Sequence, residues 1–192
     1  MKHKWEFLAD LIQWHRPQIN RVFDIGISKG ATVRGIKTIF DSLLIPKPID
    51  EYYGVDPYLD PYYAASASEK RFLATWIPFK LVQLTSDEFF ADMSLIDKKA
   101  DLIFIDGSHI PEQMCKDIKN YSSLVSDGGI LAGHDYNSVL HNQYGDYTKI
   151  TKFIDNEVGA QNINIEQDAR LEGGQPTYLW WTYKREGKWS KV

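Results

Sequence analysis

Two short apolar runs, each ending in acidic and imidazole side chains, constrain the fold of this chain more than any other feature. They are Asp101–His109 (DLIFIDGSH) and Gly128–Asn137 (GGILAGHDYN). Such runs are typical of buried parallel strands, which carry functional side chains at their carboxyl ends. If the two runs form neighbouring strands, four side chains converge at one edge of a sheet. These are Asp106, His109, His134 and Asp135.

The rest of the chain alternates between strand-like and helix-like patterns, which indicates an α/β protein. Further strand-like runs lie at 21–27, 51–56, 80–86, 163–171 and 176–184. Helical patterns lie at 4–15, 33–43, 62–76, 87–96, 111–124 and 148–158. Only Glu-Gly-Gly-Gln joins the last two strand-like runs, so they are expected to be antiparallel. The prediction is a three-layer Rossmann-like sandwich, with a mostly parallel seven-stranded sheet and an antiparallel C-terminal strand.

Composition narrows the function classes. A chain of 192 residues suits one domain, here 1–192. The net charge is −4 and no Lys/Arg-rich run occurs, so a nucleic-acid partner is not expected. No apolar run approaches the roughly 18 residues of a membrane span, and the single Cys115 excludes an intrachain disulfide. We expect a cytoplasmic protein without a membrane partner, and the sequence is compatible with a monomer or a homo-oligomer.

The first strand-like run leads into a glycine-containing turn, Asp24–Gly30 (DIGISKG). Glycines after a strand let the backbone approach a ligand closely, and the following helix presents N–H groups. A dinucleotide fingerprint would need small residues at three positions, where the chain has Gly26, Ser28 and Ala31, a poor match. The acidic residue before the first glycine suits an amine-bearing ligand better than a pyrophosphate. A tight turn without a ligand is the structural alternative.

Two further strand ends carry polar residues that suit an adenosine-type cofactor. Asp56 ends the second strand, where a carboxylate can accept both ribose hydroxyls, although Asp before Pro57 also forms turns. Ser86 and Asp87 lie at the end of the third strand, where they could hold an adenine. Alternatively, they cap the helix predicted at 87–96.

Five ordered motifs resemble those of class I S-adenosylmethionine-dependent methyltransferases. They are VFDIGISKG, YYGVDPY, LTSDEFF, DLIFIDGSH and GGILAGHDY, spread over roughly residues 20–184. This range would form the cofactor-binding core, with 1–19 as an N-terminal helical cap. The DGSH and GHDY pair looks more narrowly like the metal-dependent small-molecule and sugar O-methyltransferases. The resemblance implies methyl transfer from S-adenosylmethionine to a hydroxyl of a small-molecule or glycan-type acceptor, with magnesium or manganese.

The resemblance also implies roles for individual residues. The cofactor-binding set is Asp24, Gly26, Ser28, Gly30, Asp56, Ser86, Asp87 and Asp106. The metal ligands are Asp106, His134 and Asp135. The catalytic set is His109 as general base, with Asp106 and His134. The loop 136–147 is expected to lie over the site.

One departure from the related sequences bears on the metal. Relatives with DGSH often carry Glu-Asp where this chain has His134-Asp135, and magnesium sites prefer carboxylates. Either the metal is softer or the enzyme is a metal-independent methyltransferase. Structural roles are open for both histidines, with His109 pairing to Asp106. The remaining alternatives are an NAD-type oxidoreductase, disfavoured by the glycine pattern, and a noncatalytic cofactor-binding module.

Overall fold

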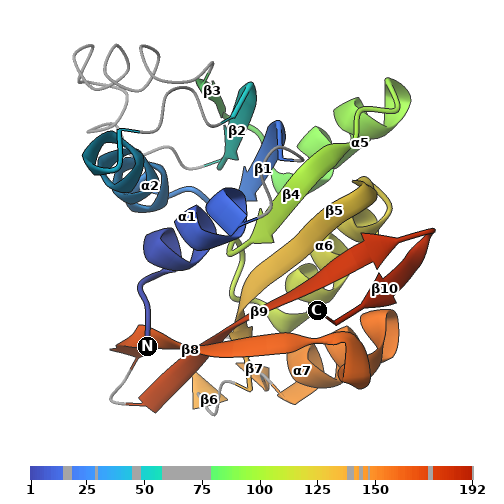
Figure 1. Cartoon of the computed structure of the whole chain (residues 1–192). Coiled ribbons are helices and arrows are strands. Elements are labelled where there is room, and N and C mark those ends of the chain that lie inside the picture. Colours follow the sequence, from blue (N-terminus) through green and yellow to red (C-terminus); the bar gives the residue numbers. More distant parts are fainter. Residues whose placement is uncertain are drawn as a thin grey trace.

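A twisted, mixed sheet forms the middle layer of the computed structural model (Figure 1). The structure describes residues 1–14, 19–28, 30–44, 49–57, 79–137, 141–142, 145–146, 148–172 and 175–191. Within these ranges the main sheet has eight strands in the order β10-β9-β5-β4-β1-β2-β3, and β8 pairs with β9. The parallel strands are β1 (Arg21–Ile25), β2 (Glu51–Val55), β3 (Phe79–Val82), β4 (Ala100–Ile105) and β5 (Val125–Tyr136). The antiparallel ones are β8 (Asn164–Glu172), β9 (Gln175–Arg185) and β10 (Lys188–Ser190).

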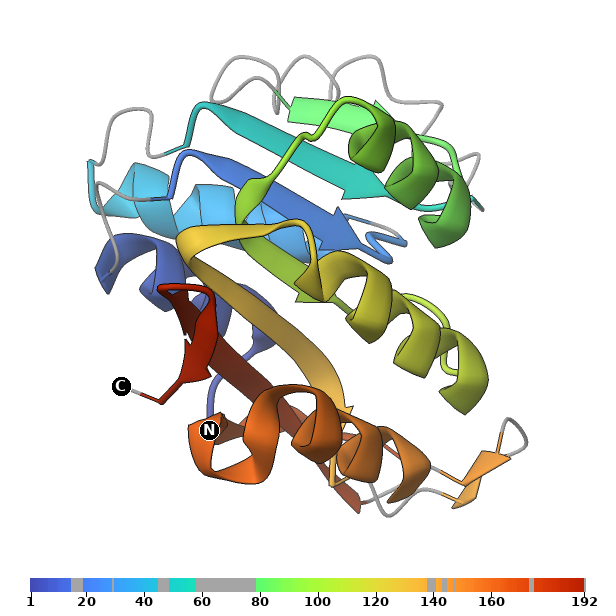
Figure 2. The same cartoon turned by 90° about the vertical axis from the view of Figure 1, so that its right-hand side faces the viewer.

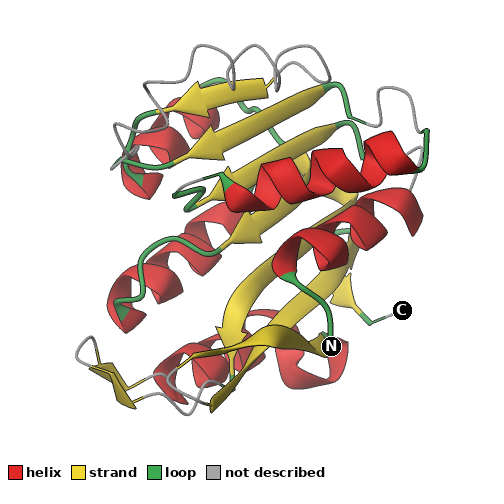
Figure 3. Ribbon diagram, turned by 90° about the vertical axis from the view of Figure 1, so that its left-hand side faces the viewer, coloured by secondary structure: helices red, strands yellow, loops and turns green. Residues whose placement is uncertain are grey.

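Helices cover both faces of the sheet (Figures 2 and 3). One face carries α1 (Lys4–Trp14) and α2 (Ala31–Ser42). The other carries α5 (Ser86–Leu95), α6 (Pro111–Ser122) and α7 (Thr148–Ile154), which continues as a π-helix (Asp155–Gly159) and a 3-10 turn (Ala160–Asn162). No helix in the described ranges is long and apolar enough to cross a membrane.

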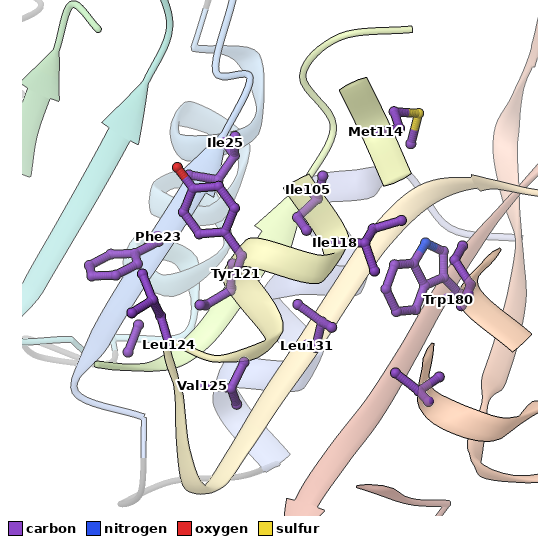
Figure 4. Packing of buried hydrophobic residues seen from close by; sticks show 14 of the residues in the cluster. Phe23, Ile25, Ile105, Met114, Ile118, Tyr121, Leu124, Val125, Leu131 and Trp180 are labelled. Carbon is purple, nitrogen blue, oxygen red and sulfur yellow. The ribbon is translucent and has the colours of Figure 1, made fainter. Parts of the chain in front are cut away.

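Alternation along the strands builds two hydrophobic cores, one on each face. Leu102 and Phe104 of β4 pack with the α1 and α2 side, whereas Ile103 and Ile105 pack with the α5, α6 and α7 side. This is the period of two that a strand buried on both faces requires. In Figure 4 the α6 side chains lie over β1, β4 and β5, with Trp180 of β9 at the end of the cluster. The cores hold the parallel strand ends in place beside one another.

The predicted three-layer Rossmann-like architecture is confirmed, and the differences are local. β5 begins at Val125, before the predicted run at 128–137, and ends at Tyr136, and β10 is an additional strand. The predicted helix at 62–76 lies outside the described residues. The described part of the loop 136–147 contains a small hairpin of β6 (His141–Asn142) and β7 (Gly145–Asp146). At its start, Tyr136 is buried and its hydroxyl donates to Asp155 Oδ1 at 2.8 Å, so this ring belongs to the core.

Candidate active site

An irregularity at the end of β5 brings two consecutive side chains into the same site. In a regular strand, neighbouring side chains point to opposite faces. The register between β5 and β9 shifts between Gly133 and Tyr136, and Asp135 adopts a left-handed φ of 63°. A non-glycine residue in this conformation is uncommon and is often found at functional sites. As a result, His134 Nδ1 lies 3.1 Å from Asp135 Oδ1, and both residues are buried.

Carboxylates surround the His134 ring. Its Nε2 lies 3.1 Å from Asp168 Oδ2 on β8 and 3.1 Å from Thr177 Oγ1 on β9. Its Nδ1 faces Asp135 and lies 3.5 Å from Asp106 Oδ1, at the end of β4. Burial alone would lower the pKa of His134, but the negative charges of Asp106, Asp135 and Asp168 raise this pKa to about 10. The pocket therefore favours a positive charge at its centre.

His109 lies beside this pocket and is the most accessible of the predicted site residues around it. Its side chain is 43% exposed, and its Nδ1 lies 3.0 Å from Asp135 Oδ2. Burial would raise the pKa of Asp135, but the contact with His109 and the charge of His134 hold this pKa well below its ordinary value. The hydrogen-bond partner of His109 is thus Asp135, not Asp106 as one interpretation of the sequence had it. A carboxylate on Nδ1 is the arrangement that orients a histidine base.

Lys4 reaches the same cluster from the start of α1, and no sequence pattern had singled it out. Its Nζ forms an ion pair with Asp106 Oδ2, and both side chains are largely buried. The segment before Lys4 is tied to β8, because the Lys2 N–H donates to Gln167 O at 3.4 Å and the Ala169 N–H donates to Lys2 O at 3.0 Å. The predicted N-terminal helix therefore supplies a cation to the site.

The glycine turn after β1 packs directly against the end of β4. Gly26 has a φ of 97°, and a Cβ at this position would lie 2.3 Å from Asp106 O. Only glycine fits such a close approach of two backbones. The turn is also tied to β2, because Ser28 N–H donates to Asp56 Oδ2 at 2.9 Å. Gly30, at φ 66°, is the N-cap residue of α2.

Asp24 is buried beneath this turn. The hydroxyl of Tyr52 donates to Asp24 Oδ2 at 2.6 Å. Burial is the main cause that raises the pKa of Asp24 to about 7, with the negative charges of Asp106 and Asp56 adding to it, whereas Tyr52 and Lys4 act in the opposite direction. This carboxyl group therefore titrates near neutral pH.

Ser86 and Asp87 occupy the first turn of α5 and contact α6. The helix cap is Thr85, which forms a capping box with Glu88, so the alternative in which Ser86 or Asp87 caps the helix is wrong. Gln113 Nε2 donates to Ser86 Oγ at 3.2 Å, and the Lys116 ammonium pairs with Asp87 at 2.7 Å. These contacts fix both residues at the carboxyl end of β3, apart from the Asp106 cluster.

The predicted metal ligands form a donor set that fits a divalent ion. Asp106, His134 and Asp135 each offer one ligand atom, and the three atoms lie within 4.8 Å of one another. His134 Nδ1 and Asp135 Oδ1 are buried and form an ion pair at 3.1 Å, and within the described residues neither makes a regular hydrogen bond. A metal-binding histidine usually gives its other N–H to a carboxylate, as His134 does to Asp168. One imidazole with two carboxylates suits manganese better than magnesium.

Comparisons with known proteins identify the family. The profile of a family described as "Methyltransferase domain" matches residues 23–136, more than half of the chain. A search of curated proteins gave no match.

Solved structures of methyltransferases share the fold at low identity. One is an rRNA methylase from Streptococcus thermophilus, with 11% identity, a TM-score of 0.64, and coverage of 97% of this chain and 99% of that chain. Another is the N-methyltransferase NodS from Bradyrhizobium japonicum, with 12% identity and a TM-score of 0.60. The match covers 95% of this chain and 97% of that chain. A third is the O-methyltransferase TomG from Streptomyces achromogenes, involved in tomaymycin synthesis and solved in complex with SAM. Its identity is 11% and its TM-score 0.62, and the match covers 93% of this chain and 78% of that chain. The chain thus belongs to the methyltransferase-domain family and is a class I S-adenosylmethionine-dependent methyltransferase.

Proposed function

We propose that this enzyme is an O-methyltransferase that acts on a hydroxyl of a small-molecule or sugar-type acceptor. The observation that supports this most is that Asp135 contacts both the proposed base, His109, and the proposed metal ligand His134. Its Oδ2 lies 3.0 Å from His109 Nδ1, and its Oδ1 lies 3.1 Å from Nδ1 of His134, which belongs with Asp135 and Asp106 to the metal donor set. A general base and a cation site are thereby held side by side. This pairing suits a hydroxyl acceptor, because a neutral hydroxyl is a poor nucleophile until it loses its proton.

The proposed proton path runs through His109. Its Nδ1–H donates to Asp135, so Nε2 is the nitrogen that accepts the acceptor's proton. S-adenosylmethionine would supply the methyl group to the acceptor oxygen and keep the electron pair of the broken carbon–sulfur bond on sulfur, while the O–H proton would pass to His109 Nε2. The product is a methyl ether with S-adenosylhomocysteine. Asp135 stabilises the imidazolium that forms on His109.

The remaining residues align the reactants. Gly26, Ser28 and Gly30 would receive the methionine part of the cofactor, with Asp24 beneath them, because their backbone forms the turn after β1. Asp56 would face the ribose, and Ser86 with Asp87 would face the adenine. A divalent ion on Asp106, His134 and Asp135 would lower the pKa of the acceptor hydroxyl and fix its oxygen. Lys4 pairs with Oδ2 of Asp106, while Oδ1 of Asp106 lies 3.5 Å from His134 Nδ1.

A methyl-transfer assay with labelled S-adenosylmethionine tests the proposal. The acceptor panel contains sugar nucleotides, catechols and other small hydroxyl compounds, with amines and ribosomal RNA as competing classes. We expect an alkali-stable methyl ether on a member of the hydroxyl group. Labelling of RNA or of an amine alone would contradict the proposal. His109→Gln should lower turnover at least about 10²-fold. The control is Asp97→Asn, which removes a carboxylate whose side chain is 86% exposed and should leave turnover unchanged.

Two further measurements separate the alternatives. Turnover that persists in excess chelator would leave the enzyme a metal-independent methyltransferase, with His109 and Asp135 still in their roles. Thermal stabilisation by S-adenosylhomocysteine but not by NAD is expected. Cofactor binding without any transfer across the panel would favour the noncatalytic binding module.

A further inference from the structure

We propose that Asp168 is a positioning residue of this site. It accepts a hydrogen bond from His134 Nε2 and so fixes the imidazole with Nδ1 directed at Asp106 and Asp135. The inference rests on the proposed function only in taking Nδ1 as a metal ligand. Asp168 and its neighbour Thr177 lie outside residues 23–136, where the family profile matches, so the family match assigns them no role.

The contacts select one orientation of the ring. Nε2 lies 3.1 Å from both Asp168 Oδ2 and Thr177 Oγ1, while Nδ1 lies 3.1 Å from Asp135 Oδ1. A half-turn about the Cβ–Cγ bond would exchange each nitrogen for a carbon and lose all three contacts. His134, Asp168 and Thr177 are almost fully buried, so water does not replace the lost partners. The ring is therefore held from behind by β8 and β9.

Asp168 is itself fixed by the surrounding backbone. It forms an isolated bridge with Lys2 of the N-terminal segment, and the β8–β9 register shifts between Gln167 and Leu171. This irregularity in the strand pair directs the carboxylate toward β5. Trp180 of β9 adds a second anchor, because its Nε1 donates to His134 O at 3.2 Å. The C-terminal hairpin thus supplies a rigid support for a residue on another strand.

The test measures the Mn²⁺ affinity of the whole chain without cofactor or acceptor. Binding is detected as a decrease of the EPR signal of the free ion. Asp168→Asn keeps the side-chain volume but removes the charge. We expect it to weaken Mn²⁺ binding about 10- to 100-fold, the usual cost of losing such a partner. The matched control is Glu166→Gln on the same strand, whose carboxylate pairs with Lys2 at 3.5 Å; its affinity should stay within about twofold of the wild type. Equal affinity of Asp168→Asn and wild type would overturn the inference.

A second readout keeps this outcome distinct from a failure of the proposed function. If wild-type protein binds no Mn²⁺, the metal part of the proposed function is wrong. The positioning role is then decided by side-chain ¹⁵N resonances of His134, assigned through their absence in His134→Gln. Asp168→Asn should shift these resonances, whereas unchanged resonances would overturn the inference. If Asp168→Asn does not fold, Thr177→Val takes its place in both measurements, with the same direction of change expected.

Discussion

Removing the charge of Asp24 should change the pH dependence of stability in a calculable way. Asp24 is buried beneath the glycine turn and hydrogen-bonded to Tyr52, and its pKa in the folded protein is about 7, against 3.8 for an unperturbed aspartate. Because the folded pKa is the higher one, the native state binds the proton more tightly than the unfolded chain. This contribution to stability is fully present below about pH 4 and is lost as the pH rises through about 7.

The size of the effect follows from the two pKa values. A difference of about 3 units corresponds to about 4 kcal/mol, and about 3 kcal/mol of this falls between pH 5 and pH 8. Asp24→Asn has no such titration, and its amide oxygen still accepts the Tyr52 hydroxyl. We therefore expect the stability of Asp24→Asn relative to wild type to increase by about 3 kcal/mol between these pH values.

Urea unfolding followed by tryptophan fluorescence measures this difference, in chelator and without cofactor. Comparing the two proteins at each pH cancels the titration of groups that they share. Tyr52→Phe is the companion variant: it removes a bond that lowers the pKa of Asp24, so its stability should fall more steeply with pH than that of the wild type. An Asp24→Asn difference that is the same at pH 5 and pH 8 would refute the reasoning.

Three other substitutions test separate parts of the site. Gly26→Ala places a Cβ 2.3 Å from Asp106 O at a φ of 97°, so unfolding experiments should show a loss of at least about 2 kcal/mol and calorimetry a loss of S-adenosylhomocysteine binding. Lys4→Met leaves the largely buried Asp106 without its ammonium partner and should cost about 3 kcal/mol in urea unfolding, whereas Lys4→Arg should retain most of the stability. His109→Gln should lower the methyl-transfer rate about 10²- to 10⁴-fold while calorimetry shows unchanged S-adenosylhomocysteine affinity; equal losses of rate and affinity would argue against a base.

The sequence was sufficient for the sheet and for the convergence of its polar strand ends. β4 and β5 are parallel neighbours, so residues at their carboxyl ends meet once the pairing is known. Asp106, His109, His134 and Asp135 could therefore be placed together from two apolar runs. The partner of His109 could not, because Asp135 reaches it only through the register shift and left-handed backbone after Gly133.

The residues that complete the site come from elements whose packing has no local signal. Lys4 lies in an amphipathic helix whose apolar stripe predicts burial of one face but not which strand end its first lysine reaches. Asp168 and Thr177 lie on the hairpin after the matched domain, and their approach to His134 depends on the irregular β8–β9 register. The sequence pattern predicts that these segments are strands of the sheet. Only the tertiary structure shows that their side chains contact His134.

A crystal structure of the protein grown with S-adenosylhomocysteine and manganese tests the central claim most directly. We expect the cofactor along the carboxyl ends of β1 and β2, with its methionine part on the turn that contains Gly26. An anomalous manganese peak should lie between Asp106, His134 and Asp135, next to the exposed edge of His109. A manganese peak elsewhere, or a cofactor sulfur facing away from His109, would contradict the account.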